Sequence, residues 1–138
     1  MHAHEPTCSE AVNAYAKELV ELDQMLKRMV FESYGIDAKK RESFLECNNY
    51  VLRFYKYLPA RIDEGENGVL PHPDTTLFTI LHQDAEGLEV QNKHDQWFRL
   101  PVSPSLFCVV AGDAFSVTLI PAYSSYMTLI TFYPQYEI

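Results

Sequence analysis

Basic side chains and long apolar runs are both scarce in this chain of 138 residues. Its 11 lysines and arginines stand against 19 aspartates and glutamates, which gives a formal net charge of −8. Binding to nucleic acid needs a basic patch for the phosphates, so this balance argues against a nucleic-acid partner. No run of about 18 apolar residues occurs, so we expect no membrane-spanning segment.

Cysteines are few, and their pattern excludes two classes of site. Cys8, Cys47 and Cys108 are odd in number and widely spaced. This favours free or buried thiols in a reducing compartment over a disulfide framework. The absence of CxxC or paired Cys/His spacing argues against zinc. The N-terminal stretch MHAHEPTCSE lacks the charged-then-apolar order of a secretory signal, so we expect a cytoplasmic protein.

What is present is ordinary globular composition, with 47% apolar and 22% charged residues. A chain of this length fits one domain, which we expect over residues 1–138. Its beginning predicts helix. Thr7 followed by Glu10 has the pattern of a capping box, apolar residues then recur with helical spacing, and Gly35 is typical of a helix end. A second helix is expected over residues 39–46.

After residue 47 the sequence favours strands. The stretch YVLRFYKY at 50–57 is dense in β-forming residues, and 59–71, with two glycines and two prolines, predicts a loop. Further strands are predicted at 77–81, 88–91, 97–100 and 106–110. The link NKHD between the second and third of these is typical of a hairpin turn. The fold class is therefore α+β, with a helical segment at 1–47, a β core at 48–115 and a tail at 116–138.

The candidate functional residues are a histidine and an aspartate two positions apart, His72 and Asp74. Alternate residues of a strand share a face, so both side chains can reach one ion. Together with a second histidine they would form the two-His-one-carboxylate triad that binds iron(II). The alternative is a pair of polar residues at a strand end. The spacing itself does not decide, because it occurs by chance in many chains.

An ordered set of motifs surrounds this pair. It consists of His72 to Asp74, Thr79 to Gln83, Gly87 to Val90, Trp97, Pro104-Ser105 and Gly112-Asp113. Over about residues 20–115 this set resembles the plant iron(II)- and 2-oxoglutarate-dependent dioxygenases, and within them the AOP branch of glucosinolate side-chain metabolism.

The resemblance implies a double-stranded β-helix, a jelly-roll barrel with helices packed outside it. It implies Fe(II) and 2-oxoglutarate as cofactors, His72 and Asp74 as iron ligands, and oxidation of a small plant metabolite. Tyr57 matches a family tyrosine that contacts the 2-oxoglutarate carboxylate; the alternative is a tyrosine of the barrel wall.

The likeness stops after Phe115. Family members continue to a second iron-binding histidine, expected near Thr128, and to an arginine in R-x-S that pairs with 2-oxoglutarate. Residues 116–138 contain neither a histidine nor an arginine. His82 could reach the iron only if the chain folds back, and His94 lies in the predicted turn. We therefore expect impaired catalysis.

The resemblance also leads us to expect that the chain lacks the N-terminal domain and the last barrel strands of the family. We expect an incomplete jelly roll whose exposed strand edges favour self-association. The aromatic tail is open to two outcomes, a substitute strand that covers the opening or an aggregation-prone segment. The alternative function is a non-catalytic β-rich remnant that acts as a binding or interaction protein.

Overall fold

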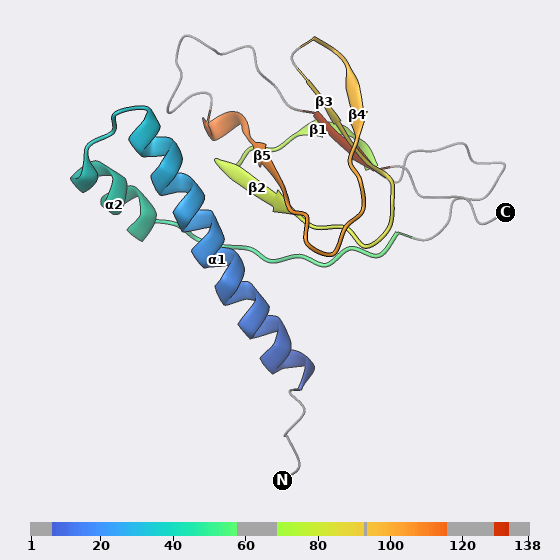
Figure 1. Cartoon of the computed structure of the whole chain (residues 1–138), viewed down its shortest axis with the longest axis horizontal. Coiled ribbons are helices and arrows are strands. Elements are labelled where there is room, and N and C mark those ends of the chain that lie inside the picture. The colour runs from blue at the N-terminus through green and yellow to red at the C-terminus, as the bar shows by residue number, and fades with distance from the viewer. Residues whose placement is uncertain (1–6, 58–68, 93, 116–128, 133–138) are drawn as a thin grey trace, which may run out of the picture. The chain divides into compact units, whose positions relative to one another are not determined.

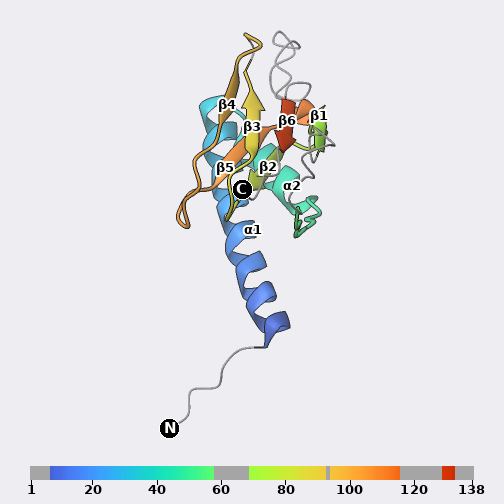
Figure 2. The same ribbon diagram turned by 90° about the vertical axis from the view of Figure 1, so that its right-hand side faces the viewer.

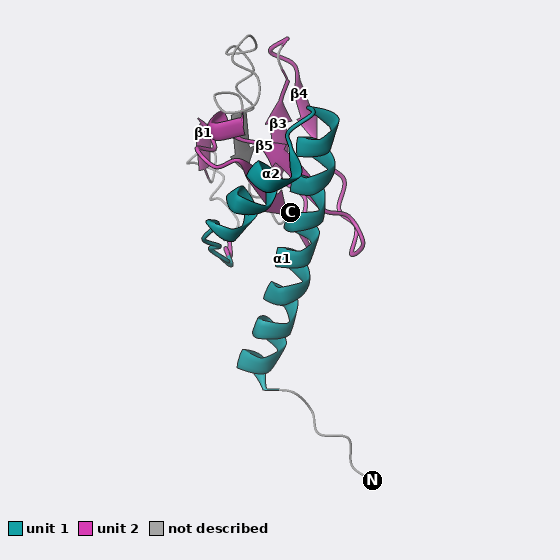
Figure 3. Cartoon of the chain, turned by 90° about the vertical axis from the view of Figure 1, so that its left-hand side faces the viewer, with its two compact units in different colours: residues 1–54 teal, residues 55–138 magenta. Residues whose placement is uncertain are grey.

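The computed structural model describes residues 7–57, 69–92 and 94–115, together with the backbone of 129–132 (Figure 1). The chain divides into two compact units, Met1–Phe54 and Tyr55–Ile138, which Figure 3 colours separately. The first unit is helical and the second contains all the described strands.

Helix α1 (Cys8–Ser33) begins at the predicted capping box. The hydroxyl of Thr7 accepts the backbone N–H of Glu10 at 3.3 Å, and the Glu10 carboxylate accepts the backbone N–H of Thr7 at 2.8 Å. Each side chain thus satisfies a backbone donor that the first turn leaves free. After the helix, Gly35 has a φ of +69°, a conformation that favours glycine. Both predicted ends are confirmed.

Helix α2 (Ala38–Glu46) begins at Asp37, whose carboxylate accepts the backbone N–H of Lys40 at 3.1 Å. It packs on α1 through the rings of Phe31 and Phe44, which meet edge to face with centroids 5.3 Å apart. Phe31 is fully buried. Its burial supplies the apolar contact that a nine-residue helix needs, because short isolated helices are marginal in water.

The second unit contains two antiparallel sheets. The strands are β1 (Val69–Pro73), β2 (Phe78–Leu81), β3 (Leu88–Gln91), β4 (Trp97–Arg99), β5 (Cys108–Ala111) and β6 (Leu129–Phe132). A four-stranded sheet has the order β1-β6-β3-β4, and β2 pairs with β5 in a second sheet (Figure 2). Within the described residues these sheets do not close into a barrel. The α+β class is confirmed, as helices followed by two antiparallel sheets.

Four strands and the hairpin were predicted well. β3 has the predicted bounds, β2 and β4 differ from theirs by one residue at one end, and β5 is shifted by two residues at its start and one at its end. In the turn between β3 and β4, the Asn92 side-chain oxygen accepts the backbone N–H groups of His94 and Gln96 at 2.9 and 3.1 Å. Asp95 takes a φ of +60°, which tight turns require.

Two sequence predictions fail. Residues 50–57 have no regular secondary structure, because β propensity stabilises a strand only where a neighbouring strand and a buried face are available. Conversely, β1 starts at Val69, inside the predicted loop. Pro71 falls in the irregular register between Val69 and His72, and Pro73 is the last residue of β1, which is an edge of the described sheet; bulges and edge strands are the positions where sheets tolerate proline.

The core of this unit lies between its sheets. Leu88 of β3 and Val110 of β5 are buried and belong to one cluster, against which Leu81, Leu100 and Cys108 pack. β6 shows that residues 129–132 of the tail do form a strand, placed between β1 and β3. All three cysteines are free, as expected, and no helix in the described part of the chain is long and apolar enough to cross a membrane.

Candidate metal site

His72 lies in β1, opposite Ile130 of β6. Its Nδ1 is 2.9 Å from the carbonyl oxygen of Leu70. Only a protonated ring nitrogen can donate to a carbonyl, so this contact assigns the proton to Nδ1 in the neutral ring and leaves the lone pair on Nε2. Metal-bound histidines typically show this arrangement, in which one nitrogen is held by a carbonyl and the other faces the metal.

Asp74 follows the end of β1, and its Oδ1 is 4.0 Å from Nε2 of His72. Its Oδ2 is buried and has no hydrogen-bond partner within the described residues. A buried carboxylate oxygen without a partner is costly, because it has lost its water and gained nothing in return. A cation bound beside His72 would supply the missing partner.

The pair supplies two of the three residue types of an iron(II) triad. Its donor atoms, 4.0 Å apart, are near enough for one ion with bonds of about 2.1 Å to reach both, but they lie farther apart than adjacent ligands of such a triad, so the two side chains would have to draw together around an ion. A complete set is not formed, since no group of three His, Cys, Asp or Glu side chains suited to a metal exists in the described part of the chain. The described residues therefore offer two protein ligands for one metal ion and not the full triad.

The other histidines among the described residues, His82 and His94, do not complete the site. The ring of His82 packs against that of Phe107 at a tilt of 39°, with centroids 4.9 Å apart, and His94 is exposed in the hairpin turn as predicted. His2, His4 and Thr128 lie outside the described residues. The strand that follows Thr128, β6, runs beside β1 at His72.

Tyr57 is half-buried in a segment without regular secondary structure, and its ring stacks on Tyr55 with centroids 6.1 Å apart. Burial raises the pKa of the Tyr57 phenol, and the nearby Tyr55 adds to the shift. The phenol therefore stays neutral and able to donate a hydrogen bond at physiological pH. Its predicted contact with 2-oxoglutarate stays a prediction.

Sequence reasoning used Gly112 and Asp113 only as a motif and missed their place at the site. The backbone N–H of Asp113 donates to the carbonyl oxygen of Asp74 at 2.8 Å, and Gly112 packs against the same loop. The Gly-Asp motif, which matched the family pattern, was the signal that could have identified them.

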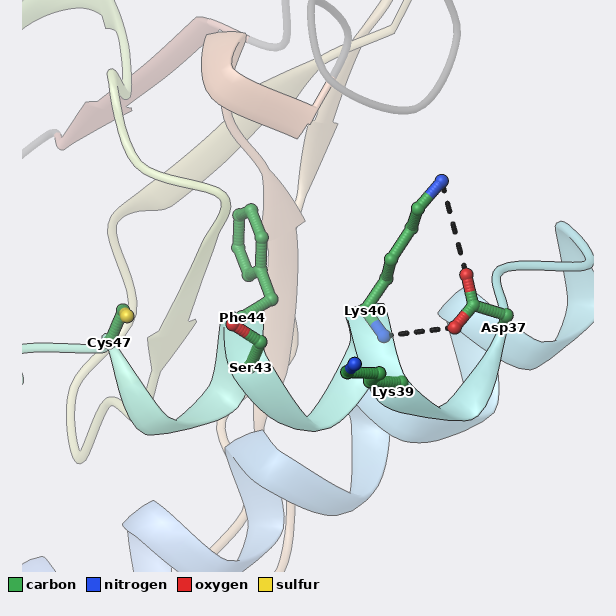
Figure 4. Close-up of a pocket in the computed structure, with 6 residues that line it drawn as sticks. All are labelled: Asp37, Lys39, Lys40, Ser43, Phe44 and Cys47. Carbon is green, nitrogen blue, oxygen red and sulfur yellow. Dashed lines mark hydrogen bonds and ion pairs between the residues drawn. The ribbon is translucent and has the colours of Figure 1, made fainter.

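One hollow lies on the helical unit, away from these residues in the sequence. It is an open groove of about 790 Å³ along α2, shown in Figure 4. Its lining residues are Asp37, Lys39, Lys40, Ser43, Phe44 and Cys47. The ammonium group of Lys40 lies 3.9 Å from the carboxylate of Asp37, so these two charges compensate each other. None of the predicted site residues lines this groove.

Comparison with known proteins identifies a family. Residues 47–125 match the model of the 2OG-Fe(II) oxygenase superfamily. The chain is 37% identical over 116 residues to the probable 2-oxoglutarate-dependent dioxygenase AOP1 of Arabidopsis thaliana, which covers 80% of this chain and 38% of that protein. The chain thus spans little more than a third of this relative.

Two further relatives from Arabidopsis thaliana are each 45% identical over 53 residues, which is 38% of this chain. One is the 2-oxoglutarate-dependent dioxygenase AOP2, of which 12% is covered. The other is the probable inactive 2-oxoglutarate-dependent dioxygenase AOP2, of which 13% is covered. Equal similarity to both means that sequence identity does not decide activity.

Proposed function

Because this chain belongs to the 2OG-Fe(II) oxygenase superfamily, we propose that it is a 2-oxoglutarate-dependent dioxygenase-like protein in which His72 and Asp74 hold Fe(II). In this class the metal supplies the oxygen chemistry, and the protein supplies its ligands and a shaped cavity. The observation that carries the proposal is the buried, unpartnered Oδ2 of Asp74 beside the Nε2 of His72.

We propose that the two sheets are an incomplete double-stranded β-helix, with residues 48–115 as its core. The antiparallel pairing and the shared cluster of Leu88 and Val110 support this assignment. In the described part, β1 and β4 are the edges of the larger sheet, and such edges favour pairing with other chains. Self-association of the chain with His72 and Asp74 unchanged would therefore fit an incomplete double-stranded β-helix.

Tyr57 is proposed to donate its phenol O–H to a carboxylate oxygen of 2-oxoglutarate. The raised pKa of this phenol supports the role, because a neutral hydroxyl can donate to a carboxylate. The substrate is proposed to be a small plant metabolite, by analogy with the family.

Catalysis is proposed to be impaired. Residues 116–138 provide no histidine for the third ligand position and no arginine for the distal carboxylate of 2-oxoglutarate. Each missing metal ligand lowers affinity and loosens geometry. A missing arginine removes a charge-assisted hydrogen bond to the cosubstrate.

Succinate release in the presence of Fe(II), ascorbate and 2-oxoglutarate tests this function without a known substrate, provided that uncoupled turnover occurs. We expect release far below roughly 1 s⁻¹, the low end of ordinary enzymes. It should vanish in His72→Ala and persist in His94→Ala, which removes an exposed histidine from the turn.

Equal release by His72→Ala and the wild type would refute the role of the pair. Release at or above about 1 s⁻¹ would contradict impairment. Failure to release succinate, together with failure to bind metal, would support the non-catalytic alternative.

A further inference from the structure

The two candidate metal donors are anchored in different sheets. His72 belongs to β1 of the four-stranded sheet, where it lies opposite Ile130. Asp74 begins the short loop at 74–77 that leads to β2 of the two-stranded sheet. The distance between the donors therefore depends on whatever holds this loop.

The residues immediately after β5 hold both ends of the loop. The backbone N–H of Gly112 donates to the carbonyl oxygen of Leu77 at 3.1 Å. The next N–H, that of Asp113, donates to the carbonyl oxygen of Asp74 at 2.8 Å. These bonds continue the pairing of β5 with β2 beyond Ala111 and tie the backbone of Asp74 to the smaller sheet.

Gly112 also lies where no side chain fits. A Cβ built on it would lie 2.1 Å from the carbonyl oxygen of Thr76 and 2.7 Å from that of Asp74. Both obstructing atoms belong to the backbone, so a larger residue must displace the loop itself. Gly112 is not among the positive-φ glycines, so this close approach is the reason for glycine here.

We propose that Gly112 and the backbone N–H of Asp113 position the Asp74 carboxylate beside His72, and that metal affinity depends on both. The inference rests on the proposed function. Gly112 and Asp113 touch no metal in this account and act only through Asp74. Groups that orient a metal ligand from outside typically contribute ten- to hundredfold to metal affinity.

Asp113 offers a matched pair of variants. Asp113 is the first residue of a helical turn, a position that accepts proline and whose N–H has no partner within the helix. Asp113→Pro removes the N–H that donates to Asp74. Asp113→Ala keeps the N–H but, like the proline variant, removes the carboxylate. The difference between them isolates the hydrogen bond.

Co(II), a stable stand-in for Fe(II), should be titrated into the full chain by calorimetry. We expect Asp113→Pro to bind Co(II) roughly tenfold more weakly than Asp113→Ala, and Gly112→Ala to bind it roughly ten- to hundredfold more weakly than the wild type. The unfolding midpoint of each variant, measured in parallel, separates lost positioning from lost folding. Equal affinity of the two Asp113 variants, with folding intact, would overturn the inference.

Amide hydrogen exchange keeps the inference testable if Co(II) binding is absent or if Gly112→Ala fails to fold. The Asp113 amide should be protected in the wild type, because it donates to Asp74. Exchange at the rate of an unstructured amide would overturn the inference. If the wild-type chain binds no Co(II), the proposed metal binding by His72 and Asp74 is refuted instead. The exchange measurement then tests only whether the Asp113 N–H holds the loop at Asp74.

Discussion

Truncation of Val110 tests the core that joins the two sheets. Val110 is 3% exposed and packs with Leu88, whereas its neighbour Val109 is 41% exposed on the opposite face of β5. Val110→Ala removes two buried methyl groups at about 0.8 kcal/mol each and leaves a cavity, for a total of about 2–3 kcal/mol. Val109→Ala makes the same chemical change and should cost about 1 kcal/mol or less.

Urea unfolding followed by the fluorescence of Trp97 measures this difference. Trp97 is the only tryptophan and lies on β4, in the same unit as the core. For a urea dependence of about 2 kcal/mol per M, Val110→Ala should lower the midpoint by roughly 1 M. Equal midpoints for the two alanine variants would refute the packing of β5 against β3.

Two further outcomes follow from pKa directions. Burial raises the pKa of the Cys108 thiol, so iodoacetamide should label Cys108 more slowly than the exposed Cys8 and Cys47 in the native chain. Mass spectrometry measures the three labelling rates, which should become similar in denaturant. The backbone N–H of Thr7, and to a lesser extent its hydroxyl, donates a hydrogen bond to Glu10 and holds the pKa of that carboxyl below its ordinary 4.5. The ionised carboxylate therefore stabilises α1 above that pH, and this contribution is lost as the pH falls through the lowered pKa. Helicity at 222 nm should therefore fall less in Glu10→Gln than in the wild type between about pH 5 and 3, and identical titrations would contradict the role of Glu10 in the cap.

Local signals in the sequence predicted most of the elements correctly. The capping box at Thr7, the glycine after α1 and the hairpin turn at Asn92 each act within a few residues, so their outcome is nearly independent of the rest of the chain. Segment 50–57 failed for the opposite reason. Its side chains favour a strand, but pairing depends on distant partners that local sequence does not reveal.

The candidate site was predictable in part. His72 and Asp74 could be chosen from their spacing and motif, and the structure brings their donor atoms within 4.0 Å. The Gly-Asp motif could have marked Gly112 as a residue of the site, but not its close approach to the loop at Thr76, because that approach joins residues more than thirty positions apart through backbone atoms. Long-range pairing likewise places β6 beside β1, whereas the sequence did not decide whether the tail forms a strand.

Metal affinity of the His72–Asp74 pair is the most direct test of the account. Co(II) titration should be compared for the wild type, His72→Ala, Asp74→Asn and the control His94→Ala. We expect weak but saturable binding by the wild type and by His94→Ala, and loss of that binding in the other two variants. Binding by His72→Ala and Asp74→Asn that equals the wild type would contradict this expectation.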